Sequence, residues 1–255
     1  MNIITLLTDF GIKDPYAGIM KGVILSINPD VIIIDITHEA EPQDVREAAF
    51  LIEEYYSYFG KGTIHVAIVD PTVGSERKPV IFEKNGYYFI GPDNGIFSLL
   101  IDTNTQFYTI ENKDFIRPHV SSTFHGRDIF APAAAYLSQG KTLTEFGAPL
   151  YNPVVLDNIL PKIEGNVLYG EVVRFDRFGN AITNISHNLF ERFTGNKPFT
   201  IRIGKMRFHS LRKSYFEENI ICLVGSSGYL EFAIYRGNFR EERNIWKGDS
   251  VTVTI

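Results

Sequence analysis

The chain has 255 residues and a formal net charge of −5 at pH 7, and 44% of its residues are hydrophobic. This composition is typical of a globular protein with one large domain or two smaller ones. The negative charge argues against nucleic acid or an acidic membrane surface as the main partner, and no apolar run reaches the roughly 20 residues of a membrane span. The single cysteine, Cys222, excludes an internal disulfide framework. A strand pattern starts at once, so we expect no signal peptide and a cytoplasmic protein.

Residues 1–150 alternate between strand and helix patterns, which predicts an α/β domain with a layered, mostly parallel sheet. Near-continuous apolar runs and a hairpin signal at Asn85-Gly86 indicate the strands, and apolar residues at helical spacing indicate the helices. The strands are expected at 3–8, 31–36, 63–69, 80–83, 87–91 and 106–110, and the helices at 16–27, 44–59, 96–100 and 128–138.

The pattern changes near residue 150. Three prolines, Pro149, Pro153 and Pro161, mark a connecting stretch, and we expect residues 151–164 to be a linker. Residues 165–255 then form a small all-β, barrel-like domain of short strands. These strands are expected at 165–175, 181–185, 199–203, 206–208, 220–224, 229–235 and 250–255, with one helix at 187–193.

Polar side chains follow the first strand in the sequence Thr8-Asp9-Phe10-Gly11, with Asp14 and Tyr16 just beyond. An acid at a strand end can accept both hydroxyls of a ribose, although a turn-forming Asp explains Asp9 equally well. Neither GxGxxG nor GxxxxGK[ST] occurs, which argues against a phosphate-containing cofactor.

A second group of polar residues combines two loops. Asp70 follows the strand at 63–69, and Arg77 lies on the same loop, at the sheet edge where ligands bind in α/β proteins. A structural salt bridge is the alternative. His125 precedes Gly126 near a helix start, whose dipole opposes protonation and favours a neutral base or acceptor. Asp70, Asp93 and His125 could ligate a metal, but the sequence has no HExxH and no cysteine cluster, so we expect no metal.

Two further motifs lie in the β domain, at 176–180 (DRFGN) and 225–231 (GSSGYLE). Phe178 and Tyr229 offer flat surfaces for a purine, and Asn180 carries the paired donor and acceptor that an adenine edge needs. The turn at Ser226-Ser227 exposes backbone N–H groups to a carboxylate. An ordinary β-turn and an ordinary hairpin remain the alternatives.

Taken together and in this order, the motifs resemble the S-adenosyl-L-methionine (SAM) hydroxide adenosyltransferase family, which shares a superfamily with the fluorinating and chlorinating SAM halogenases. The resemblance runs from Thr8 to Leu230. It implies a SAM hydrolase that forms adenosine and L-methionine, with SAM as substrate and no cofactor. It also implies a homotrimer with active sites between the N-terminal domain of one subunit and the C-terminal domain of the next.

The resemblance also implies roles for individual residues. Asp9 matches the acid that holds the ribose diol, and the catalytic group of the hydrolases matches Asp70, Arg77 and His125. The remaining expected substrate-binding residues are Asp14, Tyr16 and Asp176 for the amino-acid tail, Phe178 and Asn180 for adenine, Ser226 and Ser227 for the methionine carboxylate, Arg236 for a backbone contact near adenine, and Tyr229 and Glu231 beside them.

Three departures from the halogenases point to water as the nucleophile. Asp70 stands where the fluorinase has a tyrosine, Gly126 stands where the halogenases have a halide-binding serine, and the hairpin around residues 82–87 lacks a long insertion. A carboxylate repels a halide in a poorly hydrated site. We expect in-line attack of water on ribose C5′. The alternatives are a SAM- or adenosine-binding protein with little turnover, a SAM-dependent halogenase, and a metal-dependent hydrolase.

Overall fold

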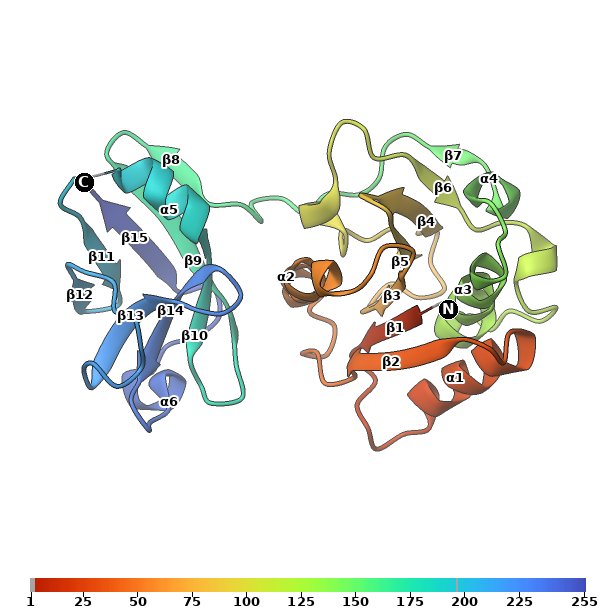
Figure 1. Ribbon diagram of the computed structural model, residues 1–255, viewed down its shortest axis with the longest axis horizontal. Coiled ribbons are helices and arrows are strands. Elements are labelled where there is room, and N and C mark those ends of the chain that lie inside the picture. Colours follow the sequence, from red (N-terminus) through yellow and green to blue (C-terminus); the bar gives the residue numbers. More distant parts are fainter. Residues whose placement is uncertain (1–2, 196) are drawn as a thin grey trace. The chain divides into compact units, whose positions relative to one another are not determined.

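Two separate sheets organise the residues that the computed structural model describes, 3–195 and 197–255 (Figure 1). The chain divides into an N-terminal unit, Met1–Asp157, and a C-terminal unit, Asn158–Ile255. Each unit encloses hydrophobic clusters of its own. Within the described residues, no helix has both the length and the apolar character needed to cross a membrane.

The N-terminal unit contains a seven-stranded sheet in the order β2-β1-β3-β5-β4-β6-β7. Strand β1 pairs in parallel with β2 and β3, and β3 pairs in parallel with β5, whereas β4, β6 and β7 extend the sheet with antiparallel pairs. The strands are β1 (Ile3–Thr8), β2 (Ile32–Thr37), β3 (Ile64–Ile68), β4 (Pro79–Lys84), β5 (Tyr87–Pro92), β6 (Phe107–Thr109) and β7 (Pro149–Leu150).

Helices cover both faces of this sheet, so its central strands are buried on both sides. Alternate residues of β3 face different hydrophobic clusters: Val66 packs in one with α1 (Tyr16–Ile27) and α3 (Ala131–Ser138), and Ala67 packs in the other with α2 (Val45–Tyr55). This double burial explains the near-continuous apolar runs of β1 and β3. Short helical segments complete the unit: η1 (Tyr56–Tyr58), η2 (Ser98–Leu100), η3 (Lys113–Phe115), η4 (Gly126–Phe130) and α4 (Leu143–Phe146).

The C-terminal unit is an antiparallel, nearly closed, barrel-like sheet in the order β12-β11-β15-β9-β10-β14-β13, with β8 paired to β9. Alternate inward residues such as Ile201, Phe232 and Val253 fill its core together with the buried Cys222. The elements are β8 (Lys162–Glu164), β9 (Val167–Phe175), β10 (Ala181–Ser186), α5 (His187–Thr194), β11 (Thr200–Ile203), β12 (Met206–Phe208), β13 (Ile220–Val224), β14 (Tyr229–Ile234), α6 (Phe239–Arg243) and β15 (Ser250–Thr254).

The predicted fold class is confirmed, but several elements differ from the expectation. The prediction of a single helix in the β domain was wrong, because α6 is also helical; its five residues are too few for an apolar period to show. The helix expected at 128–138 begins instead with a π-helical turn, η4, and the one expected at 44–59 ends at Tyr55 before a 3₁₀ turn. Strand β8 falls within the stretch 151–164.

Candidate active site

Asp70, Arg77 and His125 come together at the carboxyl end of β3. Arg77 Nε donates to both carboxylate oxygens of Asp70, at 3.1 and 3.0 Å, and Arg77 Nη2 contacts both Asp70 and Nδ1 of His125, the latter at 2.7 Å. The side chains of Asp70 and Arg77 are only 5% and 6% exposed. The two loops that were singled out separately in the sequence therefore form one continuous polar group.

The contact with Arg77 determines the protonation of His125. A guanidinium carries only donors, so Nδ1 must accept, and the proton of the neutral imidazole lies on Nε2. Burial, and then the positive charge of Arg77, lower the pKa of His125, whereas Asp70 and Asp128 oppose this change. Burial and Arg77 thus both favour the neutral imidazole of His125.

Gly74 allows the two loops to approach each other. Its φ of +81° is in the left-handed region, and a Cβ on this residue would lie 2.3 Å from the carbonyl oxygen of Ser122. A side chain at this position would push apart the loop that carries Asp70 and Arg77 and the loop that carries His125.

One donor of Arg77 is left over. Its Nη1 is buried and has no hydrogen-bond partner within the described part of the chain. A buried polar group without a partner is costly, and in native proteins it calls for a specific explanation such as a bound ligand or water. The geometry thus supplies a guanidinium N–H for an oxygen that is not part of the protein.

The loop after β1 lies against the His125 loop through aromatic contacts. Phe10, Tyr16 and Phe124 form a three-ring cluster with centroid distances of 5.2 to 5.9 Å. A Cβ on Gly126 would lie 3.4 Å from Phe10 Cζ, 3.3 Å from Phe124 Cε2 and 3.2 Å from Met20 Sδ. There is little room at this position for the serine of a halogenase.

Asp9 lies in this loop with one carboxylate oxygen engaged. Its Oδ2 accepts the backbone N–H of Gln43 at 2.9 Å, while within the described residues Oδ1 accepts no hydrogen bond. Tyr16, a member of this aromatic cluster, is partly exposed, and Asp14 is exposed. The N-terminal unit thus brings Asp9, Tyr16 and the polar group of Asp70, Arg77 and His125 to one edge of its sheet.

Two other polar residues of the predicted motifs hold the protein's own backbone. Asp93 Oδ1 accepts the N–H of Val154 at 2.8 Å, and burial raises the pKa of Asp93. Asp128 is fully buried, binds Arg127 through both carboxylate oxygens, and accepts the N–H of Ser121 at 2.9 Å. Within residues 3–195 and 197–255, no group of three His, Cys, Asp or Glu side chains could hold a metal ion.

In the C-terminal unit, Asp176 and Asn180 close the turn between β9 and β10. Asp176 Oδ1 accepts the backbone N–H groups of Phe178 and Asn180, and its Oδ2 accepts the side-chain amide of Asn180 at 2.9 Å. Phe178 projects from this turn and is 74% exposed. Arg236 follows β14 with a φ of +57°. The aromatic surface expected for adenine is therefore presented by a rigid turn.

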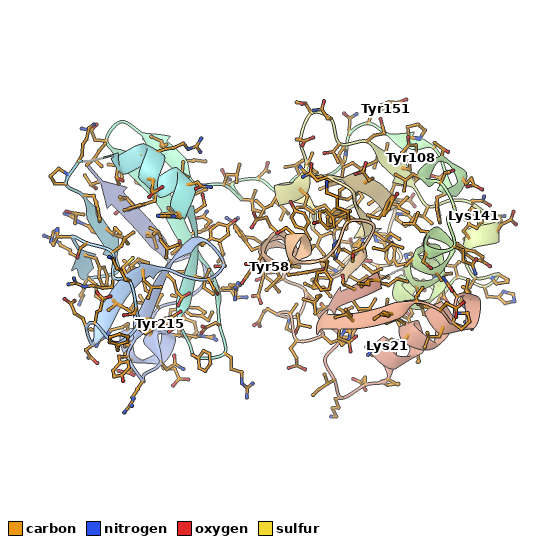
Figure 2. All side chains as sticks on the ribbon, in the orientation of Figure 1. Lys21, Tyr58, Tyr108, Lys141, Tyr151 and Tyr215 are labelled. Atoms are coloured by element: carbon orange, nitrogen blue, oxygen red, sulfur yellow. The ribbon has the colours of Figure 1, made fainter. Side chains whose placement is uncertain are left out.

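The turn at Ser226-Ser227 lies at the opposite end of β14, with Tyr229 at the start of that strand. Glu231 lies beneath it: a Cβ on Gly225 would meet Glu231 Oε2 at 2.3 Å. Glu231 is buried and accepts a hydrogen bond from Tyr215 Oη at 2.8 Å. The sequence motifs did not reveal Tyr215, labelled in Figure 2, because it lies in an irregular connection between β12 and β13.

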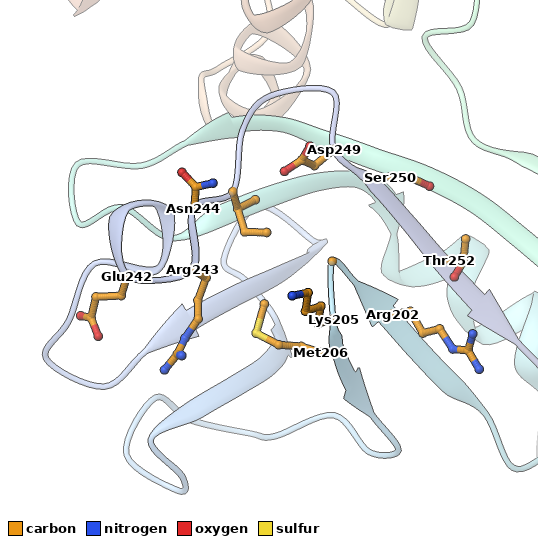
Figure 3. A pocket seen from close by; sticks show the side chains of 11 residues that line it. Arg202, Lys205, Met206, Glu242, Arg243, Asn244, Asp249, Ser250 and Thr252 are labelled. Carbon is orange, nitrogen blue, oxygen red and sulfur yellow. The ribbon is translucent and has the colours of Figure 1, made fainter.

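A cavity of about 820 Å³ in the C-terminal unit lies elsewhere, beside α6, β11 and β15 (Figure 3). Its lining includes Arg202, Lys205 and Arg243 together with Glu242 and Asp249, and it contains none of the predicted substrate-binding residues. We therefore place the candidate active site at the edge of the N-terminal sheet, not in this cavity.

Comparisons with known proteins match this chain over almost its full length. The model of the SAM hydroxide adenosyltransferase N-terminal domain matches residues 4–147, and that of the C-terminal domain matches residues 170–252. Proteins named (R)-S-adenosyl-L-methionine hydrolase match from Methanocaldococcus jannaschii (38% identical, 99% of this chain, 96% of that protein) and from Thermus thermophilus (34%, 97% and 98%).

A fluorinase from Actinoplanes sp. is more distant, at 27% identity over 99% of this chain and 97% of its own length. Among solved structures, an uncharacterized conserved protein from Thermotoga maritima matches with a TM-score of 0.90 and 35% identity, covering 99% of this chain and all of that one. Since both domain models match in order and together span most of the chain, the protein belongs to the SAM hydroxide adenosyltransferase family.

Proposed function

We propose that the protein hydrolyses SAM to adenosine and L-methionine by in-line attack of water on ribose C5′. The unpaired Nη1 donor of Arg77, buried beside Asp70 and His125, is the observation that carries this proposal. Full-length relatives named (R)-SAM hydrolase support it. The sulfonium leaves as a neutral thioether, so the protein has only to position and activate the water.

The hydrogen bonds of the triad suggest a role for each member. Arg77 Nη1 donates to the oxygen of the water and favours its hydroxide character. His125 has its Nδ1 lone pair engaged by Arg77, so it offers an N–H rather than a base. Asp70 is left as the proton acceptor because it is the only carboxylate of the triad; its oxygens also accept from Arg77 and, at Oδ1, from the Thr72 hydroxyl at 3.3 Å. General-base assistance of this kind contributes typically about 10²–10⁴-fold to a rate.

The substrate contacts are proposed for two sets of residues. In the N-terminal unit, Asp9 binds the ribose hydroxyls through its free Oδ1, and Asp14 and Tyr16 contact the amino-acid tail. In the C-terminal unit, the residues for adenine and the tail are Asp176, Phe178, Asn180, Ser226, Ser227, Tyr229, Glu231 and Arg236. Among these, Asp176 and Glu231 act by holding Asn180 and Tyr215, because their carboxylates are already engaged.

Halide selectivity requires a direct test, because Arg77 neutralises Asp70 and so weakens the repulsion that a bare carboxylate would exert. Purified protein is incubated with SAM and a strong chelator, with and without chloride or fluoride. We expect adenosine and methionine in equal amounts and no halogenated adenosine. A 5′-halogenated product would support the halogenase alternative, and loss of turnover with the chelator would support a metal-dependent hydrolase.

The same experiment identifies a binding protein with little turnover, because it measures how many adenosine molecules form per protein chain. Hydrolysis by an enzyme continues well beyond one adenosine per protein chain, whereas a binding protein stops at or below one and retains the nucleoside. The homotrimer is likewise a proposal from the family resemblance, and the cytoplasmic location is a proposal from the sequence pattern alone. Light scattering during size-exclusion chromatography tests the homotrimer.

A further inference from the structure

His38, a residue that no sequence motif singled out, lies directly behind the loop that carries Asp9. Its Nδ1 lies 2.8 Å from Thr8 Oγ1, and its backbone oxygen accepts the N–H of Gly11 at 2.7 Å. Thr8 Oγ1 in turn accepts the N–H of Phe10 at 3.3 Å. One residue therefore holds the loop 8–11 on both sides of Asp9.

Asp35 determines how His38 is protonated. His38 Nε2 is buried and lies 3.1 Å from Asp35 Oδ1, although it makes no hydrogen bond within the described part of the chain. A carboxylate only accepts, so the imidazole proton lies on Nε2 and Nδ1 accepts from the Thr8 hydroxyl. Thr8 then accepts from Phe10 N–H. The donors thus run in one direction, from Phe10 to Thr8 and from Thr8 to His38, whose Nε2 faces the Asp35 carboxylate without a hydrogen bond.

This row of contacting residues is shielded from solvent near the loop, and the negative charge of Asp35 at its far end is neutralised by a lysine. Thr8 is fully buried and His38 is only 7% exposed, so both lie beneath the surface of the loop. At the outer end, Lys21 on α1, labelled in Figure 2, pairs with Asp35 on β2. The buried hydrogen bonds from Phe10 to Thr8 and from Thr8 to His38 hold these residues in one arrangement.

The segment that follows His38 also holds Asp9. The N–H of Ala40 donates to the backbone oxygen of Thr8 at 3.3 Å, and the N–H of Gln43 donates to Asp9 Oδ2. Gln43 has a φ of +67°, an unusual conformation for a residue other than glycine. The segment 38–43 therefore fixes both the backbone before Asp9 and the Oδ2 atom of its carboxylate. With these two points held, the direction of the remaining oxygen, Oδ1, is fixed as well.

We propose that His38 is a positioning residue that, through Thr8, holds the Asp9 carboxylate for the two ribose hydroxyls. This inference rests on the proposed function, in which Asp9 binds the ribose. It differs from a general structural role in one respect: loss of His38 should impair recognition of the hydroxyls and leave recognition of the rest of the nucleoside intact.

The test compares binding of adenosine and of 2′,3′-dideoxyadenosine by calorimetry. His38→Ala should weaken adenosine binding by about tenfold or more and leave dideoxyadenosine binding unchanged. His38→Asn, whose side-chain oxygen restores an acceptor for the Thr8 hydroxyl, should recover much of the loss. Asp9→Ala should cause the same selective loss, and His38→Ala in addition to Asp9→Ala should cause no further loss, because both act on one interaction.

His65 provides a matched control. It is also a buried histidine of the N-terminal unit, and its Nδ1 also lies 2.8 Å from a threonine of β1, Thr5, but farther from the edge that carries Asp9. His65→Ala should leave the ratio of the two affinities at the wild-type value. An equal loss for both nucleosides in His38→Ala, or the same selective loss in His65→Ala, would overturn the positioning role.

The behaviour of the wild-type protein shows whether the proposed function or only this further inference has failed. If the wild-type protein neither hydrolyses SAM nor binds adenosine, the proposed function has failed and the positioning role fails with it. If the wild-type protein does both and His38→Ala retains the full preference for adenosine, only the positioning role is wrong.

Discussion

Arg77 Nη2 donates to His125 Nδ1 at 2.7 Å, and this single contact determines which nitrogen of the imidazole carries the proton. The same guanidinium holds Asp70 through Nε and leaves Nη1 unpaired. Arg77 is thus the centre of the triad, with Asp70 on one side and His125 on the other. Its position makes the protonation of His125 depend on its charge.

The pKa of His125 should respond in opposite directions to changes in its two partners. Arg77 lowers this pKa and Asp70 raises it. In an NMR titration of the imidazole C–H signals, we expect a wild-type midpoint below the ordinary 6.5, a higher midpoint in Arg77→Gln, and a still lower one in Asp70→Asn. Turnover should therefore be insensitive to pH near neutrality and decline only in the acidic range. Shifts of the same sign in both variants would contradict this arrangement.

Asp70→Asn should lower kcat for SAM hydrolysis by roughly 10²–10⁴-fold, because the amide keeps the shape of the carboxylate but cannot take the proton of the water. KM should change little, since Asp70 is not among the proposed substrate contacts. The control is Asp102→Asn, which alters another carboxylate paired with a cation, Lys84, at 3.0 Å. Steady-state kinetics of adenosine release measure both. An unchanged kcat in Asp70→Asn would remove Asp70 from the mechanism.

Gly74→Ala should reduce turnover by separating the catalytic loops, because its Cβ would meet the carbonyl oxygen of Ser122. Gly62→Ala is the matched control: Gly62 also has a positive φ, +88°, but a Cβ there would meet nothing within 4 Å. Both variants incur the cost of a left-handed alanine, about 1–2 kcal/mol of the free energy of unfolding. Only Gly74→Ala should also lower kcat. Equal kinetics in the two variants would show that loop approach is not needed for catalysis.

His65 should make the protein less stable as the pH falls from about 6.5 to about 4. Burial lowers its pKa in the folded protein to about 4, so the unfolded chain binds the proton first. The loss is on the order of 3 kcal/mol when complete. The ring packs among five aromatic side chains, Tyr55, Tyr56, Phe59, Tyr87 and Phe89.

Urea unfolding at pH 7 and pH 5 checks this expectation. The decrease in the free energy of unfolding should be smaller in His65→Gln than in the wild type, because glutamine does not titrate in this range. The same decrease in both proteins would mean that other groups account for the acid sensitivity.

Much of the fold could be predicted from local patterns. The strand at 3–8 and the helix at 16–27 have the expected bounds, because a doubly buried strand and an amphipathic helix each leave a long apolar period in the sequence. The hairpin at Asn85-Gly86 was also predictable, since both residues adopt the positive φ that such a turn requires. Short elements such as α6 and β8 leave no comparable period.

The candidate site was only partly predictable. Asp9, Asp70 and His125 each stand in a polar motif beside a predicted strand or helix, and the sequence identified them. His38 also follows a strand, β2, and that position at the carboxyl end of the strand was the available signal for it. Tyr215 leaves no signal, because its role depends on a contact with Glu231, 16 residues away.

The sequence alone determined which side chains end up at the edges of the sheets, because the order of apolar runs and turns decides which residues follow each strand. Only the tertiary structure decided how these side chains are paired. Arg77 could have bound Asp70 alone, but the approach of the two loops at Gly74 gives it His125 as well and leaves Nη1 without a partner. That outcome depends on distances between residues that are 48 positions apart, and no local pattern encodes them.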